Sequence, residues 1–288
     1  MQLAASNKIE SRFSGDELMK LSKQQLQFFE TFGYLHFPGL MKEEVGWIIE
    51  DFEAIFEASE QVHDGTQRSC IVPFIDQRER LCTLLDHPSI DGLISSILGE
   101  DFNYLGGDGN FYTGDTRWHS DGFHTIGKYL KVAFYLDRLT ADTGSLRVIP
   151  GSHRVDVEEW SARQAREAAD LWGIEQQEVP HAALETQPGD VVAFNHNLMH
   201  SSFGGDTARR MFTINCCAHC ETPTEIEEME KFVAGGARFW KDQMHSEIMR
   251  STASPSRMRH LEQVMAHESH LPALSAKARQ EMAEPARG

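Results

Sequence analysis

Apolar residues recur at helical spacing in three segments of the first hundred residues. The stretch SKQQLQFFETF, from Ser22 to Phe32, predicts a helix that Ser22 caps at its N-terminus. Residues 42–61 and residues 87–101 show the same spacing, and the helix predicted within the second segment ends at Gly99. Between the first two helices, GYLHFPGLM predicts a short strand. We therefore expect a mainly helical region over about residues 1–100.

From Phe102 onward the spacing of apolar residues shortens to the two-residue period that is typical of strands. The segments FNYLGGDGNFYT, YLKVAFYLD, SLRVIP, GDVVAFNH and RRMFTINCC are short, rich in β-branched and aromatic residues, and bounded by turn residues. They predict a β-core over about residues 101–220, interrupted by a helical insertion near 155–169. Charged helical segments return over 221–288. This order fits a mainly β fold of jelly-roll or cupin-like type with flanking helices, in a single domain spanning 1–288.

Charge and hydropathy limit the partners. The chain has 288 residues, with 27 basic and 44 acidic side chains and a formal charge of −17. Such a chain repels phosphate backbones and anionic membranes, and no local basic run offsets this. The N-terminus lacks the apolar core of a signal peptide, and no apolar run reaches the ~20 residues of a membrane span. We expect a cytoplasmic protein without nucleic-acid or membrane partners.

The five cysteines do not predict a disulfide framework, because their number is odd and no secretion signal precedes them. The stretch CCAHC contains a Cys-x-x-Cys pair. A zinc site of this type needs a second pair at suitable spacing, and the chain has none. We interpret these residues as small buried thiols at the end of a strand.

The stretch TRWHSDGFH carries the candidate metal chemistry. His119 and Asp121 are two residues apart, so on an extended chain both side chains project to the same side. A third ligand must come from elsewhere. His200 follows the strand GDVVAFNH and precedes a turn, and we favour it over its rival His196. Two histidines and one carboxylate leave coordination positions open, as in non-haem Fe(II) oxygenases.

The stretch ARRMFTIN supplies a clamp for a 2-oxo acid. An inward-facing arginine, either Arg209 or Arg210, can bind the distal carboxylate of such an acid with two parallel hydrogen bonds. Ser202 can add a hydroxyl contact. An Arg-Arg pair is more often a solvated surface pair. The hypothesis of a 2-oxo acid site therefore depends on the order and spacing of the metal ligands and the arginine together.

Residues next to the metal strand are weaker candidates. Tyr112 and Asn110 are candidates for the cofactor pocket, and Trp118, Phe123 and His124 for contacts with the substrate. Packing in the core is an equal alternative for each of them.

With these residues assembled, the sequence resembles the phytanoyl-CoA dioxygenase family of Fe(II)- and 2-oxoglutarate-dependent oxygenases. The resemblance runs from about Leu26 to Cys220 and rests on FFETFGYLHFPGLMKEEV, WHSDGFH, DTGSLRVIPGSHR and PGDVVAFNHNLMHSS followed by ARR. It implies a double-stranded β-helix in which His119, Asp121 and His200 hold iron. It also implies that one arginine of the pair, for which we favour Arg209, binds 2-oxoglutarate.

The resemblance further implies hydroxylation of a small molecule with release of succinate and CO2, using Fe(II), 2-oxoglutarate and O2, with ascorbate as a stimulant. Asp121 disfavours halogenation, because halogenating relatives carry a small residue there. Desaturation, cyclisation or epimerisation would use the same cofactors. Alternatives of other classes are a non-enzymatic jelly-roll protein that binds a metal or ligand, and a hydrolytic zinc site.

The substrate is not identified by the sequence, although the acidity of the chain disfavours large anions such as acyl-CoA. The C-terminal segment is expected to cover the cavity, to form a homodimer contact, or both.

Overall fold

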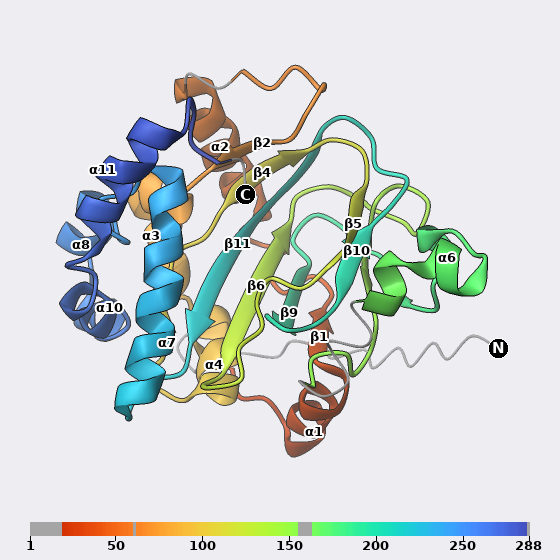
Figure 1. Ribbon diagram of the computed structural model, residues 1–288. Coiled ribbons are helices and arrows are strands. Elements are labelled where there is room, and N and C mark those ends of the chain that lie inside the picture. The colour runs from red at the N-terminus through yellow and green to blue at the C-terminus, as the bar shows by residue number, and fades with distance from the viewer. Residues whose placement is uncertain (1–18, 60–61, 155–162, 287–288) are drawn as a thin grey trace.

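Two antiparallel β-sheets form the centre of the molecule, and helices lie outside them (Figure 1). The computed structural model describes residues 19–59, 62–154 and 163–286. The larger sheet has the strand order β1-β9-β6-β11-β4-β2, with β3 paired to β11, and the smaller sheet has the order β5-β10-β7-β8. The jelly-roll fold class is therefore confirmed.

The strands lie at the following positions: β1 (Tyr34–Phe37), β2 (Ser69–Ile71), β3 (Asn103–Tyr104), β4 (Gly109–Tyr112), β5 (Thr116–His119), β6 (Tyr129–Tyr135), β7 (Leu146–Val148), β8 (Ala182–Leu184), β9 (Val191–Asn195), β10 (His200–Ser202) and β11 (Arg209–Cys217). The helices are α1 (Lys23–Phe32), α2 (Val45–Ala58), α3 (Glu79–Cys82), α4 (Pro88–Leu98), α6 (Ala168–Trp172), α7 (Pro223–Ala234), α8 (Glu247–Ser251), α9 (Pro255–Arg259), α10 (Glu262–Ala266) and α11 (Leu271–Glu281). Short 3₁₀ turns add η1 (Ile75–Gln77), η2 (Thr83–Asp86), η3 (Gln176–Glu178) and η4 (Gly235–Phe239).

The three predicted N-terminal helices are present. Ser22 caps α1 and forms a capping box with Gln25, and Gly33 ends the helix with a φ of 83°. Helix α4 ends at Gly99, as its sequence predicts. Two strands of the larger sheet, β1 and β2, come from this same N-terminal region. The sheet therefore begins before residue 101.

The predicted strand segments hold β1, β3, β4, β6, β7, β9 and β11, and β5 is the extended stretch that carries His119. Strands β2, β8 and β10 are additional short strands of three residues each. Short strands carry too few residues for the alternation of apolar and polar positions to be visible. The predicted insertion near 155–169 lies partly outside the described residues. Its described part is helical and continues into α6.

The main core lies between the larger sheet and the N-terminal helices. Phe52 of α2, Phe74, Phe134 of β6 and Phe212 of β11 are each at most 1% exposed. The rings of Phe134 and Phe212 stack with centroids 4.5 Å apart. Burial of this aromatic layer fixes β6 and β11 side by side, and both strands border the candidate site.

The C-terminal segment packs against one end of the larger sheet (Figure 1). Met229 and Val233 of α7 are fully buried together with Tyr129 of β6 and Leu271 of α11. Because α7 and η4 also contribute to the wall of the central cavity, this segment covers the site, as expected.

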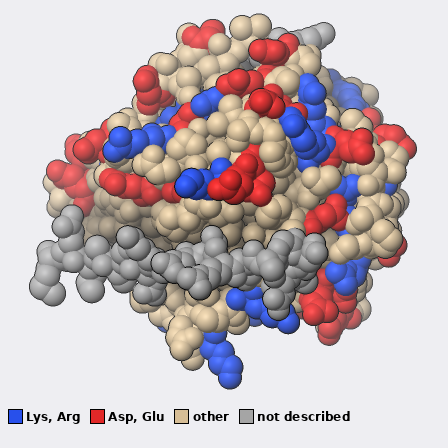
Figure 2. Space-filling model, turned by 180° about the vertical axis from the view of Figure 1, so that it is seen from behind, with Lys and Arg blue, Asp and Glu red and all other residues tan. Residues whose placement is uncertain are grey.

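The five cysteines are all buried as free thiols. Within the described residues, no helix is long and apolar enough to cross a membrane. On the face that Figure 2 shows, blue basic side chains are interspersed with red acidic ones rather than gathered in one basic area.

Thr222 caps α7, and its hydroxyl accepts a hydrogen bond from the Glu225 amide. We expect Thr222→Ala to lower the free energy of unfolding by about 1 kcal/mol, because the amide loses its partner. Thr125→Ala, at an exposed threonine outside the helix, is the matched control. Urea unfolding checks this, and equal midpoints for the two variants would contradict the role of the cap.

Candidate active site

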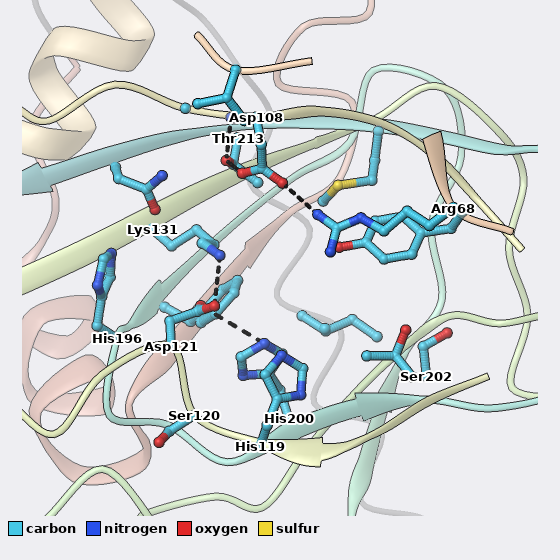
Figure 3. Close-up of a pocket in the computed structure, with 18 of the residues that line it drawn as sticks. Arg68, Asp108, His119, Ser120, Asp121, Lys131, His196, His200, Ser202 and Thr213 are labelled. Atoms are coloured by element: carbon cyan, nitrogen blue, oxygen red, sulfur yellow. Dashed lines mark hydrogen bonds and ion pairs between the residues drawn. The ribbon is translucent and has the colours of Figure 1, made fainter. Parts of the chain in front are cut away.

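The pairing of β5 with β10 brings the candidate metal ligands together. In this antiparallel register His119 lies directly opposite His200, and their ring centroids are 4.2 Å apart. Asp121 follows β5, and one ligand atom from each of the three residues lies within 4.8 Å of the others. Figure 3 shows the two imidazoles beneath the Asp121 carboxylate. The three predicted ligands therefore converge on one point.

Backbone carbonyls orient both imidazoles in the same way. Nδ1 of His119 donates to the Arg117 carbonyl at 2.8 Å, and Nδ1 of His200 donates to the Leu198 carbonyl at 2.9 Å. With the proton on Nδ1, the lone pair of each Nε2 is available to a metal. Burial lowers the pKa of His200 to about 3, which keeps that ring neutral.

The Asp121 carboxylate faces two ways. Its Oδ1 lies 2.8 Å from the Lys131 ammonium, and its Oδ2 lies 3.7 Å from Nε2 of His200. Burial alone would raise the pKa of Asp121, but Lys131 and the neighbouring histidines outweigh burial and hold it well below its ordinary value. One oxygen is thus anchored and the other is free for a metal. This donor set fits Fe(II) in the two-histidine, one-carboxylate arrangement.

His196, the rival third ligand, lies outside this group. Its ring packs 5.8 Å from the ring of Phe232 and 5.9 Å from that of Tyr129, and burial lowers its pKa to about 3. Its backbone carbonyl accepts hydrogen bonds from the amides of Asp121 and Gly122. His196 therefore shapes the turn after β5 through its main chain.

Arg209 lies inside the protein and Arg210 points away, as alternation along β11 predicts. Arg209 is 8% exposed, donates to the Gly144 carbonyl at 2.7 Å and also contacts the Ser202 hydroxyl. Its Nε has no partner among the described residues. Arg210 instead forms an ion pair with Asp137 at 2.6 Å. Arg209 is therefore the better candidate for the carboxylate clamp.

These residues border a cavity of about 730 Å³, which is within the range of small-molecule sites of roughly 300–1,000 Å³. Tyr112 and Trp118 line it, as predicted. Asn110, Phe123 and His124 do not belong to its wall.

The reasons for these three exclusions differ. Asn110 accepts from Arg68 and donates to Asp108 behind the wall. The Phe123 side chain is 60% exposed, and the His124 ring contacts Glu228 of α7 at 3.2 Å.

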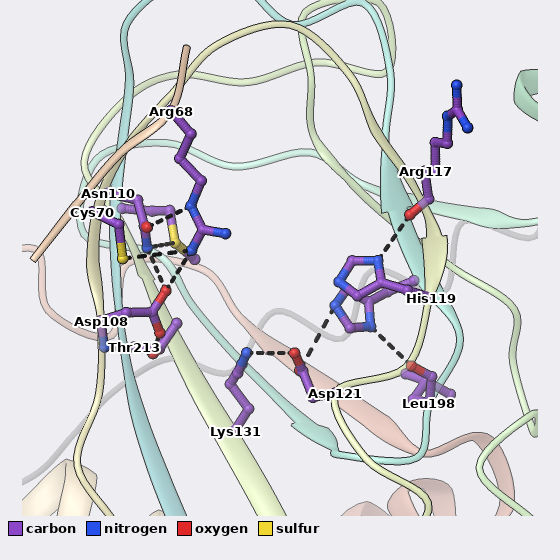
Figure 4. A network of polar contacts seen from close by, with 12 residues as sticks. Arg68, Cys70, Asp108, Asn110, Arg117, His119, Asp121, Lys131, Leu198 and Thr213 are labelled. Carbon is purple, nitrogen blue, oxygen red and sulfur yellow. Dashed lines mark hydrogen bonds and ion pairs between the residues drawn. The ribbon is translucent and has the colours of Figure 1, made fainter. Parts of the chain in front are cut away.

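The sequence did not single out Lys131, Arg68 or Asp108. Figure 4 shows Arg68 bound to Asp108, at 2.9 Å, and Lys131 bound to Asp121. A signal for Lys131 exists, since it is the only charged residue within the apolar strand β6, YLKVAFY. A charge placed in the interior of a strand marks a partner or a site.

A sequence model of the phytanoyl-CoA dioxygenase family matches residues 29–211. A search of curated proteins finds no match. Among solved structures, SnoK, a non-haem α-ketoglutarate-dependent carbocyclase of nogalamycin biosynthesis, is 22% identical, with a TM-score of 0.54 over 69% of this chain and 84% of its own. EctD from S. alaskensis, in complex with 2-oxoglutarate and 5-hydroxyectoine, is 22% identical, with a TM-score of 0.54 over 73% and 79%. The epimerase SnoN of the same nogalamycin route is 17% identical, with a TM-score of 0.53 over 68% and 81%.

We expect His200→Ala to weaken Fe(II) binding by about 100-fold or more, because one of three protein donors is lost. His196→Ala, which removes the neighbouring buried imidazole, is the matched control and should retain binding. Anaerobic calorimetric titration with Fe(II) measures both variants. Retention of wild-type affinity by His200→Ala would rule out this metal site.

Proposed function

This chain belongs to the phytanoyl-CoA dioxygenase family, and we propose that it hydroxylates a small organic molecule with release of succinate and CO2. The enzyme is a non-haem iron, 2-oxoglutarate-dependent dioxygenase. The observation that carries the proposal is the convergence of His119, Asp121 and His200 beside the buried Arg209. A non-enzymatic jelly-roll protein would have no need of that clamp.

We assign His119, Asp121 and His200 as the iron ligands. Bound Fe(II) supplies the activation of O2 that couples oxidative decarboxylation of 2-oxoglutarate to oxidation of a substrate C–H bond. The protein contributes orientation: the Arg117 and Leu198 carbonyls hold the two imidazoles, and Lys131 holds the carboxylate. This preorganisation keeps the three donors in place before a metal arrives.

We assign Arg209 and Ser202 to the distal carboxylate of 2-oxoglutarate. The Ser202 hydroxyl donates to the Gly144 carbonyl at 2.9 Å, which fixes its lone pairs relative to the guanidinium. Space around Arg209 depends on two glycines, since a Cβ on Gly144 or Gly205 would lie 2.7 or 2.5 Å from guanidinium nitrogens. The Tyr112 ring covers the Arg209 guanidinium, with 5.5 Å between the ring centroid and Cζ, and limits the access of water.

Hydroxylation, rather than another oxidative outcome, is the most specific part of the proposal. SnoK is described as a carbocyclase and SnoN as an epimerase, and both share this fold. Product mass separates the outcomes. A gain of one oxygen supports hydroxylation, a loss of two hydrogens indicates desaturation or ring formation, and an unchanged mass indicates epimerisation.

The direct experiment incubates the protein with Fe(II), 2-oxoglutarate and ascorbate in air and measures succinate, with and without a panel of metabolites. Stimulated succinate formation together with a product heavier by one oxygen is the expected result. Absence of succinate with Fe(II) would overturn the proposal, and hydrolytic activity that depends on zinc would indicate the hydrolytic alternative.

We expect Arg209→Gln to raise the KM for 2-oxoglutarate by roughly 100-fold, because the loss of one member of a buried charge contact costs about 2–5 kcal/mol. Arg210→Gln removes the adjacent arginine on the other face of β11 and is the matched control. Succinate formation against 2-oxoglutarate concentration gives both KM values, and thermal melts verify folding. Equal KM values would refute the assignment of Arg209.

A further inference from the structure

The wall of the cavity is strongly cationic, although the chain carries a formal charge of −17. Among the residues that the structure describes, eight basic residues and only two acidic ones, Asp108 and Asp121, line it. Both acids are already paired, with Arg68 and Lys131 respectively. The positive charge of the cavity therefore exceeds what its own carboxylates neutralise.

Most of the basic residues have a partner or an assigned role. Arg210 pairs with Asp137 and Lys231 pairs with Glu227, while Arg209 is assigned to the co-substrate. Arg117 extends its guanidinium away from the two histidines in Figure 4. Arg238 and Lys241 are left, and both come from the C-terminal segment.

Lys241 is buried, with only 7% of its surface exposed, and it lines the cavity. Its Nζ makes no ion pair or hydrogen bond with any residue in the described part of the chain. The ammonium lies over Gly106, 3.4 Å from where a Cβ on that residue would be. Gly106, whose φ is +92°, thus leaves open the space next to the ammonium.

The nearest acids, Asp76 and Glu268, attract Lys241 but form no ion pair with it in the described part of the chain, and their carboxylates accept hydrogen bonds from other groups. Asp76 accepts from the Tyr104 hydroxyl at 2.7 Å and from the Ser246 amide at 3.1 Å. Glu268 accepts from the Met244 amide at 2.6 Å. Burial lowers the pKa of Lys241 to about 8, against the attraction of both acids. A buried ammonium without a contact partner is costly, and an anion from outside would relieve that cost.

Arg238 lies three residues before Lys241 and is exposed at the rim. Its guanidinium stacks over the Phe239 ring at 4.6 Å and forms no ion pair within the described residues. Phe232 and Met244 add apolar surface to the same wall. The wall therefore offers two cationic groups beside an apolar surface.

We infer that the substrate is a small organic anion, whose carboxylate or phosphate is bound by Lys241 and Arg238 and whose apolar body contacts Phe232 and Phe239. The inference rests on the proposed function for the oxidation itself. The family match ends at residue 211, before this wall begins, so the assignment comes from the structure of the C-terminal segment. It is consistent with the expectation from net charge, which disfavours large anions only, because the local field of the cavity has the opposite sign.

Anaerobic calorimetry on the protein loaded with Fe(II) and saturating 2-oxoglutarate tests the inference. The probes are benzoate, inorganic phosphate and the neutral isostere benzamide. We expect one of the two anions to bind at least tenfold more tightly than benzamide, and the better anion indicates whether the group is a carboxylate or a phosphate.

Lys241→Met should weaken that anion by about tenfold or more, the cost of breaking a buried charge contact. Arg238→Gln, at an exposed position, should weaken it several-fold. Lys42→Met, at an exposed lysine outside the cavity, is the matched control and should bind as the wild type does.

Binding of neither anion more tightly than benzamide, or wild-type affinity for the better anion in both wall variants, would overturn the inference. These binding results can be told apart from results that would refute the proposed oxygenase function. Wild-type protein that forms no succinate refutes the oxygenase, whereas anion binding is measured without turnover and reports on the wall alone.

Discussion

The antiparallel register between β5 and β10 is the constraint on which the site depends. It places His119 opposite His200, although the two are 81 residues apart in the chain. Opposite residues in such a pair have Cβ atoms about 4.5–5.5 Å apart, so the backbone itself sets a spacing suited to two ligands of one metal. A slip of one residue would turn one imidazole to the other face. Strand β10 is also paired with β7 on its other side, which resists such a slip.

Much of the fold and the central residues of the site could be read from the sequence, because the signals are local. Ser22 and Gly99 mark helix ends, and a spacing of two residues puts His119 and Asp121 on one side. His200 rather than His196 joins His119 and Asp121, as we favoured, but His196 lies in the turn after β9 and His200 begins β10, a strand that the sequence did not predict. Each of these inferences uses neighbours in the chain.

The sequence could not predict the contacts that form only when distant segments of the chain pack together. The pair of Arg68 with Asp108 joins β2 to the start of β4, and nothing near either residue announces the other. Lys241 is a stronger case. It lies at the end of TEIEEMEKFVAGGARFWKDQM, a strongly charged segment with helix-like spacing, and only the packing of α11 and η4 shows that it is buried. The absence of a partner is a property of three-dimensional surroundings and has no local pattern.

The contrast between an acidic exterior and a cationic cavity has a physical consequence for selectivity. At physiological salt the Debye length is about 8 Å, so an anion small enough to enter the cavity is governed by the groups that line it rather than by distant surface carboxylates. A large polyanion remains partly outside and meets the net charge of −17. Within the cavity, the Asp121 carboxylate is shared between Lys131 and the metal position, which leaves the positive charge of the surrounding groups in excess. The size and charge of the cavity together would then admit 2-oxoglutarate and a small organic acid while excluding long anionic chains. Neither the charge of the whole chain nor the metal ligands alone could provide this selection.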